Sequence, residues 1–176
     1  MGLSTRSRAG KSAAAAAVVV LVFSLGAPRA SAQEFVSLSL SSHAVNFNLV
    51  AGRANNPGSG SVTATTTWSL RPNRDSFSVY AYFNNAATAL NDGAGTSIAS
   101  SHFQISNNGA AFQPLTNTIV FGGANAGLRL SRVTILGNNK TGTHSDTMNF
   151  NIDLSTLPTL PPGVYVGSLV IQVQAI

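Results

Sequence analysis

The sequence predicts an all-β fold: a single immunoglobulin-like antiparallel β-sandwich of about nine strands, which follows a cleaved signal peptide. Three observations predict this fold. Apolar and polar residues alternate with period two through most of the chain after residue 33, and clusters of Gly, Pro, Asn and Asp separate the alternating runs. No long stretch repeats its apolar residues with helical spacing. A closed β-barrel is the alternative that the same pattern allows.

The first 32 residues predict a secretory signal peptide. Arg6, Arg8 and Lys11 precede the apolar stretch SAAAAAVVVLVFSLGA, and the small residues ASA at positions 30–32 fit a cleavage site before Gln33. The apolar stretch is shorter than the roughly 20 residues that a membrane-spanning helix needs; an uncleaved anchor or a buried helix is the alternative. We expect residues 1–32 to be removed and residues 33–176 to form one β-sandwich domain in the periplasm, at the cell surface or outside the cell.

Removal of the signal peptide changes the charge of the chain. The whole chain carries a formal charge of +5, but four of its ten basic residues precede the predicted cleavage site. The remaining six basic and five acidic residues leave about +1, so the mature chain has little electrostatic reason to bind nucleic acid. The chain has no cysteine, and an exported domain without disulfides must be stabilised by its core and its hydrogen-bond ladders.

The mature chain starts with two short alternating runs of opposite parity. In the first run the apolar residues Val36, Leu38 and Leu40 are at even positions, and in 45–49 the apolar residues are at odd positions. The change falls between residues 41 and 44. One interpretation is a bulged first strand, or two strands, of the same domain. The other is an arm donated to a neighbouring molecule, followed by the domain's own first strand. The short linker favours the first interpretation, and Val36, Leu38 and Leu40 are the candidates for an intermolecular strand under the second.

Three longer runs predict strands that place one face on a core and the other on water or a partner. SVTATTTWSL (61–70) puts Trp68 among the apolar residues of one parity and threonines on the other, so Trp68 is expected in the core. FSVYAYF (77–83) and TMNFNIDL (147–154) alternate in the same way. The outward parity of the second run holds Tyr80 and Tyr82, which are candidates for a surface-binding patch.

Turn signals connect these strands. HFQISNNGAAF (102–112) predicts a β-hairpin with Asn-Asn-Gly at its tip. In GLRLSRVTIL (127–136) the apolar parity changes, and a β-bulge near residues 131–132 would return both apolar pairs to one face. NNAATAL (84–90) is the one helical candidate. The segments at 54–60, 91–97 and 137–142 have the composition of loops.

Little in the sequence predicts catalysis. His43, His102 and His144 lack metal-ligand spacing, so we expect surface histidines and neither a metal nor a cofactor. Asp146 lies near His144, but no strand–Gly-x-Ser-x-Gly–helix context supports a hydrolase triad. NDGAGTS offers Asp92 as its single carboxylate, too few for a calcium loop of the EF-hand kind. We therefore expect a protein that is not an enzyme.

The final segment, PPGVYVGSLVIQVQAI (161–176), has the most specific pattern. It resembles the closing strand of spore coat protein U-like domains and of archaic chaperone–usher pilin subunits, with matching Gly163, Tyr165, Leu169, Ile171 and Val173. NFNLVAG (46–52) and GSVTATTTW (60–68) are similar to earlier segments of that family. The family commonly links its first strands through a cysteine pair, which this chain does not have.

The resemblance implies an incomplete sandwich whose apolar groove takes a strand from a neighbour. A periplasmic chaperone would hold the groove until then, and an outer-membrane usher would be a further partner. Tyr165, Leu169, Ile171 and Val173 would line the groove or the edge of the core. We expect an exported, non-catalytic structural subunit of a bacterial surface filament, fimbria or coat that pairs strands with other copies or related pilin-type subunits. The alternative is a monomeric secreted adhesion or glycan-binding module, with its site in the loops at 54–60, 91–97 and 137–142 or on the face that holds Tyr80 and Tyr82.

Overall fold

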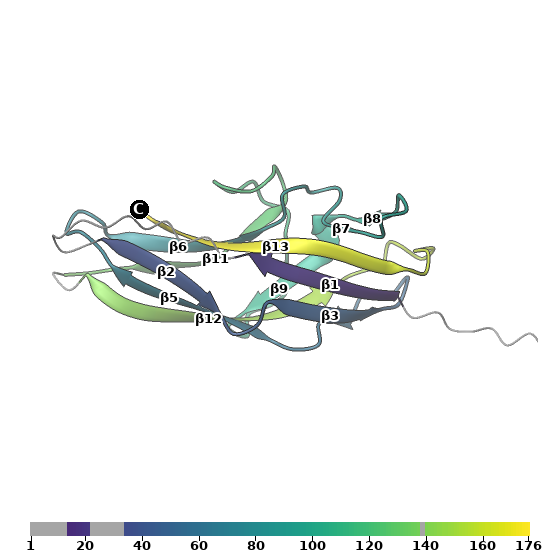
Figure 1. Cartoon of the computed structure of the whole chain (residues 1–176), viewed down its shortest axis with the longest axis horizontal. Coiled ribbons are helices and arrows are strands. Elements are labelled where there is room, and N and C mark those ends of the chain that lie inside the picture. Colours follow the sequence, from purple (N-terminus) through teal and green to yellow (C-terminus); the bar gives the residue numbers. More distant parts are fainter. Residues whose placement is uncertain (1–13, 22–33, 138–139) are drawn as a thin grey trace, which may run out of the picture.

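The computed structural model describes residues 14–21, 34–137 and 140–176, with the side chains described from residue 34 onward. In these residues the protein is all-β, with one short 3-10 turn at Ser100–His102. No helix among them is long and apolar enough to cross a membrane. The predicted signal-peptide cleavage site lies outside the described residues. The strands form two curled sheets, drawn in Figure 1.

The first sheet, sheet A, contains the last strand of the chain near its centre. Its order is β11 (Gly127–Thr134), β6 (Ser76–Tyr82), β13 (Val164–Ala175), β1 (Ala14–Leu21) and β3 (Ala44–Leu49). The short strands β7 (Leu90–Asn91) and β8 (Ser97–Ile98) extend it beside β13. Every pairing in this sheet is antiparallel except that of β1 with β13, which is parallel.

The second sheet, sheet B, is antiparallel throughout. Its order is β10 (Gln113–Pro114), β9 (Phe103–Asn107), β12 (Thr141–Ile152), β5 (Val62–Ser69) and β2 (Phe35–Leu40), and β4 (Asn56–Pro57) pairs with β12. The two sheets have thirteen strands in the described residues, where the sequence predicts about nine; four of the thirteen have only two residues. Two-residue strands of this kind form short bridges within loops. Their sequences have the composition of loops, so periodicity does not predict them.

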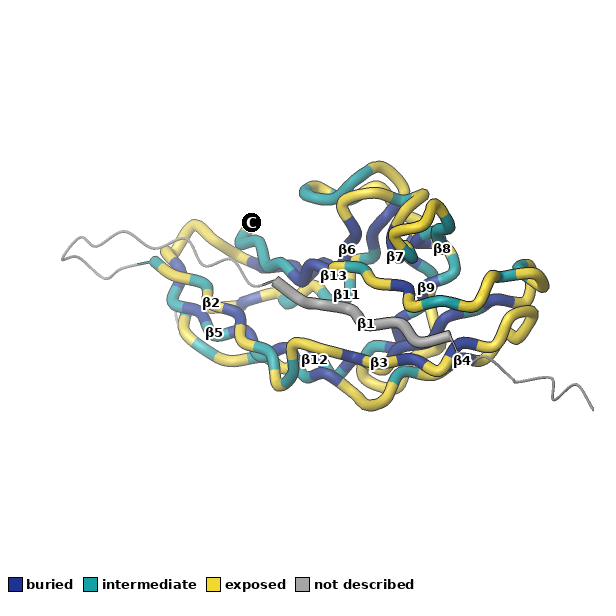
Figure 2. The backbone as a smooth tube through the Cα atoms, turned by 45° about the vertical axis from the view of Figure 1, so that its right-hand side comes forward, coloured by how far each residue is buried: buried dark blue, intermediate teal, exposed yellow. Residues whose placement is uncertain are grey.

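One core fills the space between the sheets. Figure 2 shows buried and exposed positions alternating along several strands, and β5 alternates between buried and half-buried residues over its whole length. The Phe103 ring lies edge-on to Phe47, at 5.8 Å between centroids, and to Phe83, at 5.2 Å. These rings come from both sheets and join them. Trp68 packs on Phe77 with centroids 4.7 Å apart, which confirms its predicted place in the core.

The parity change between residues 41 and 44 has a simple structural cause. β2 belongs to sheet B and β3 belongs to sheet A, so the chain crosses from one sheet to the other through residues 41–43. Each strand presents its apolar residues to the core from the opposite side, so the parity that faces inward must change at the crossing.

The predicted hairpin and bulge are confirmed, and the predicted helix is wrong. β9 and β10 pair across a tip at Asn108 and Gly109, both with positive φ, as a type I′ turn requires. The register of β11 on β6 shifts between Arg129 and Ser131, one position before the expected bulge. Residues 84–89 form a turn and no helix: the Asn85 Oδ1 accepts hydrogen bonds from the backbone N–H groups of Ala87 and Thr88, and the chain enters β7 at Leu90.

Candidate strand-binding site

The central feature of sheet A is that β1 completes it. Residues 15–21 pair in parallel with residues 164–170 of β13, and residues 14–19 pair antiparallel with β3. Figure 1 shows β1 between the two strands. We call the place that β1 fills the strand slot. With neighbouring strands about 4.8 Å apart, the two walls of the slot, β3 and the first half of β13, lie about 10 Å from each other.

Side chains of β13 fix one wall of the slot to the core. Tyr165, Leu169 and Ile171 are buried, and Val173 is partly buried against the same core. The Tyr165 hydroxyl donates a hydrogen bond to the Pro161 carbonyl oxygen at 2.9 Å, which closes the turn before the strand. Burial raises the pKa of the Tyr165 hydroxyl. The four apolar residues that the sequence assigns to a groove or core edge therefore lie together along one strand.

Gly167 allows β13 to pass close to the preceding loop. Val166 pairs with Asn91 of β7, and the backbone of Ala89 lies directly over Gly167. A Cβ at position 167 would overlap the Ala89 carbonyl oxygen and would come within 2.6 Å of a methyl group of Leu90. Apart from this pairing with β7, the segment 164–169 has β1 as its strand neighbour, because β6 pairs only with residues 170–175.

Substitution of Gly167 by alanine is expected to destabilise the protein by about 2–3 kcal/mol, because the added methyl group forces the Ala89 backbone away from β13. Chemical denaturation monitored by Trp68 fluorescence measures the change. Gly163→Ala is the matched control: the nearest atom to a Cβ there lies at 3.7 Å, an ordinary contact. Equal stability of the two variants would contradict the close approach at Gly167.

Contacts that do not involve β1 also hold the other wall, β3. Val45, Phe47 and Leu49 are each 3% exposed and face the core. On the edge of β3 away from β1, Phe47 bridges to Gly58, and the Asn46 carbonyl oxygen accepts a hydrogen bond from the Ser59 N–H at 2.8 Å. The wall is therefore attached to the body of the protein through side chains and through its far edge.

A buried asparagine fixes the segment that follows β3. The Asn56 side chain accepts a hydrogen bond from the Val50 N–H and donates to the carbonyl oxygens of Arg53 and Ile152, each at 2.8 Å. Its backbone N–H donates to Oδ1 of Asn151 on β12 at 2.8 Å. The Asn56 amide thus connects the end of β3 to sheet B. Both walls of the slot therefore have attachments to the rest of the protein that do not involve β1.

β2 lies in sheet B and not in the slot. Its six residues pair antiparallel with β5, from Phe35 opposite Ser69 to Leu40 opposite Ala64. Leu38 is 9% exposed, and Val36 and Leu40 pack against the core from the same strand. The three candidates for an intermolecular strand therefore contribute to the core of their own chain in this structure.

The two tyrosines on the outer side of β6 are covered by the chain itself. Tyr80 and Tyr82 are 8% and 7% exposed. The Phe121 ring lies edge-on to Tyr80 at 6.0 Å, and Gly122 lies so close to Tyr82 that a Cβ there would be 2.8 Å from the Tyr82 Cβ. The Tyr82 hydroxyl donates to Oε1 of Gln172 at 2.7 Å, and burial raises its pKa. Little ring surface is left for a ligand, in contrast to the open face that the sequence predicts.

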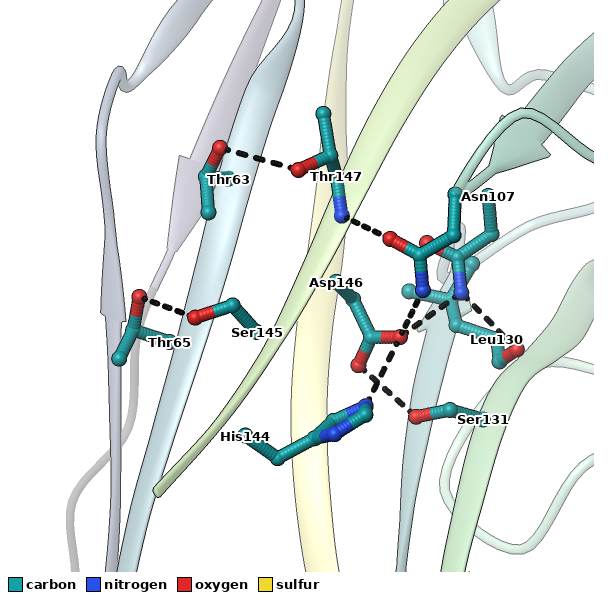
Figure 3. Close-up of polar contacts among 10 residues, drawn as sticks. Thr63, Thr65, Asn107, Leu130, Ser131, His144, Ser145, Asp146 and Thr147 are labelled. Carbon is teal, nitrogen blue, oxygen red and sulfur yellow. Dashed lines mark hydrogen bonds and ion pairs between the residues drawn. The ribbon is translucent and has the colours of Figure 1, made fainter.

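A buried carboxyl group, that of Asp146 on β12, connects three strands (Figure 3). Its Oδ1 accepts a hydrogen bond from Nδ2 of Asn107 at 2.8 Å and lies 3.3 Å from Nε2 of His144, and its Oδ2 accepts from the Ser131 hydroxyl at 2.8 Å. The same Nδ2 of Asn107 donates to the carbonyl oxygen of Leu130, the residue at the bulge. Asp146 therefore ties β9 and β12 of sheet B to β11 of sheet A.

This arrangement differs from a hydrolase triad. In a triad the imidazole lies between the hydroxyl and the carboxylate, so that it can pass a proton between them. Here both the Ser131 hydroxyl and the His144 ring contact the Asp146 carboxyl group, which stands between them. The Asp146 side chain is 1% exposed and the His144 side chain is 32% exposed. The geometry is that of a structural hydrogen-bond network.

The remaining candidates from the sequence lie apart. The described residues hold no group of three or more His, Cys, Asp or Glu side chains that could bind a metal ion. His43 is exposed at the sheet crossing, and Nδ1 of His102 lies 2.8 Å from the Asp153 carbonyl oxygen. The Asp92 carboxyl group accepts hydrogen bonds from the Ala94 and Thr96 N–H groups, and that of Ala94 is the main cause of the lowered pKa of Asp92. These bonds form a turn at 91–97, as the sequence predicts.

A scan of the chain against protein-family models gives no match, and a search of curated proteins gives none either. Function is therefore inferred from the strand slot itself.

Proposed function

We propose that the protein is an exported, non-catalytic structural subunit of a bacterial surface filament, fimbria or coat, and that it assembles by β-strand pairing. Its fold would be an immunoglobulin-like sandwich that lacks one strand after the signal peptide is removed. The observation that carries the proposal is the position of β1: a segment of the predicted signal peptide occupies the middle of sheet A.

Cleavage before Gln33 would leave two strand edges facing each other across the slot. Each edge would carry unpaired backbone N–H and C=O groups that had paired with β1, and unpaired edges of this kind form hydrogen bonds with another strand. An incoming extended segment gains hydrogen bonds on both of its sides, in addition to the burial of its side chains against the core. A strand slot of this kind is a binding site for protein segments, and it requires no catalytic group.

Strand pairing as such would allow either other copies or related pilin-type subunits as partners. A periplasmic chaperone and an outer-membrane usher would protect the slot before assembly, as the resemblance of the closing strand implies. The charge of about +1 on residues 33–176 offers no support for a nucleic-acid partner. The alternative of a glycan-binding module loses the support of Tyr80 and Tyr82, which are covered by the segment around Phe121, and would rest on the surface loops.

The test is whether chain 33–176 binds an added strand. A synthetic peptide of residues 14–21 with flanking lysines for solubility is titrated into this chain, and the melting temperature is followed. At a peptide concentration about 100 times its Kd, binding to the folded state alone adds about 2.7 kcal/mol of stability. The control peptide carries proline at the position of Val18, which pairs with Val45 and Gly167 and would lose its ladder N–H. Absence of stabilisation, or equal stabilisation by both peptides, would contradict the proposal.

A further inference from the structure

We infer that the mature chain accepts a strand from a different protein and does not polymerise by giving its own N-terminal strand to a second copy. The inference rests on the proposed function, since it concerns the occupant of the strand slot. A subunit that accepts a strand but donates none would lie at one end of an assembly, and the assembly could not grow beyond it.

The first step is that β2 is committed to its own sheet. The predicted cleavage leaves only Gln33 and Glu34 before Phe35, where β2 begins. A donated segment would have to be β2 itself, and its release would break all six register positions with β5. It would also uncover the part of the core that Val36, Leu38 and Leu40 protect.

Both ends of β2 have additional attachments. At its start, the Glu34 carboxylate lies 3.1 Å from Nε of Arg71 and 3.3 Å from Nε of Arg74. At its end, the Ser41 N–H donates to the Thr63 carbonyl oxygen at 3.0 Å, and the Thr63 N–H donates to the Ser41 hydroxyl at 2.9 Å. The exposed ion pairs contribute little energy, but together with the hydrogen bonds they extend the contact of this segment with sheet B beyond the strand.

The second step is that a second copy has no other strand to offer. After the predicted signal peptide, each strand in the described part of the chain is paired within sheet A or sheet B. The segment that does fit the slot, Ala14–Leu21, belongs to the part that is predicted to be removed. The occupant in the mature protein would therefore be an extended segment of another protein. The sequence of β1 gives its chemistry: about eight residues, uncharged, and rich in alanine and valine.

The experiment compares a chain whose β2 is locked with one whose β2 is free. Ser39 and Thr65 pair across β2 and β5, and their side chains lie away from the core. Ser39→Cys with Thr65→Cys can form a cross-strand disulfide, and the chain contains no other cysteine. Both chains are folded at full length, cut at a protease site engineered before Gln33, and incubated at high concentration. Light scattering then gives their mass, and a fluorescent peptide of residues 14–21 measures exchange at the slot.

The expected result is that both chains remain single subunits, with at most one bound peptide each, and that both take up the fluorescent peptide. Multimers of the unlocked chain that the disulfide abolishes would show that β2 is donated; this overturns the inference but leaves strand pairing as the function. Multimers of the locked chain would also overturn it, because another segment of a second copy would then fill the slot. If the cut segment 1–32 dissociates and neither chain then binds the fluorescent peptide, the proposed function fails, and the inference fails with it.

Discussion

Removal of residues 1–32 is expected to increase hydrogen exchange by about 1,000-fold at the amides of β3 and β13 that face the slot. β1 pairs with residues 44–49 and 164–170, and at about 0.5 kcal/mol for each ladder hydrogen bond its loss removes on the order of 4 kcal/mol of local protection. Native-state exchange measured by NMR or mass spectrometry on the full chain and on chain 33–176 gives the comparison.

Sheet B supplies the internal control for this experiment. β5 lies between β2 and β12, and none of these strands pairs with β1. Their amides should keep their protection when the leader is removed, apart from a uniform decrease if the global stability falls. Unchanged exchange in β3 and β13 would contradict the placement of the leader in the slot. If protection against exchange fell by the same factor in both sheets, β1 would support the whole fold and not the slot alone.

Replacement of Asp146 by alanine is expected to destabilise the protein by about 3–5 kcal/mol. The substitution removes a buried carboxyl group and takes an acceptor from the part-buried side chains of Asn107, Ser131 and His144. A lost hydrogen bond to a charged group costs about 1.5–3 kcal/mol, and three such contacts are lost together. Urea denaturation measures the loss. Ser145→Ala, at the next position of β12 and on its exposed face, is the matched control and should change stability by less than about 0.5 kcal/mol.

Hydrogen exchange distinguishes loss of the Asp146 hydrogen bonds from loss of its side-chain volume. Asn107 also donates to the Leu130 carbonyl oxygen at the bulge of β11, so loss of Asp146 should increase hydrogen exchange in β11 more than in β2, which lies at the far edge of sheet B. Asp146→Asn keeps the shape of the side chain but replaces one acceptor by a donor, and it should therefore also destabilise. Wild-type stability of the asparagine variant would mean that the packed volume, and not the acceptor oxygens, is what matters at this position.

Local patterns in the sequence predict much of the sandwich-like body correctly. The alternation in β5 and β12, the hairpin at Asn108 and Gly109, and the bulge in β11 all follow from period two and from the turn preferences of a few residues. Such features depend on neighbours within about ten residues, so they can be read without the tertiary structure.

The features that the sequence does not predict depend on contacts between distant segments. Tyr80 and Tyr82 have the outward parity of a solvent-facing strand, but the segment around Phe121 folds back over them. The network of Asp146 joins residues up to 39 positions apart. Its signal in the sequence is a single acidic residue on the apolar parity of a strand, in register with Met148 and Phe150.

The resemblance of the closing strand implies a groove beside it, but the sequence does not place residues 14–21 in that groove. Residues 12–27 have the length and composition of a signal peptide, and a secretion signal and a central β-strand both require an uninterrupted apolar run. Periodicity cannot distinguish the two, because alanine and valine satisfy both. In the structure, β3 and β13 both pair with β1, and a chain without β1 would leave these two edges without a partner.

The position of the slot between two strands also has a mechanical consequence. A segment seated there is bonded along both of its edges, so a pull along its axis loads all of its hydrogen bonds at the same time and shears them together. A strand at the rim of a sheet can be peeled away one bond after another at much lower force. A partner held in the slot would therefore resist tension along its axis far better than its equilibrium affinity indicates.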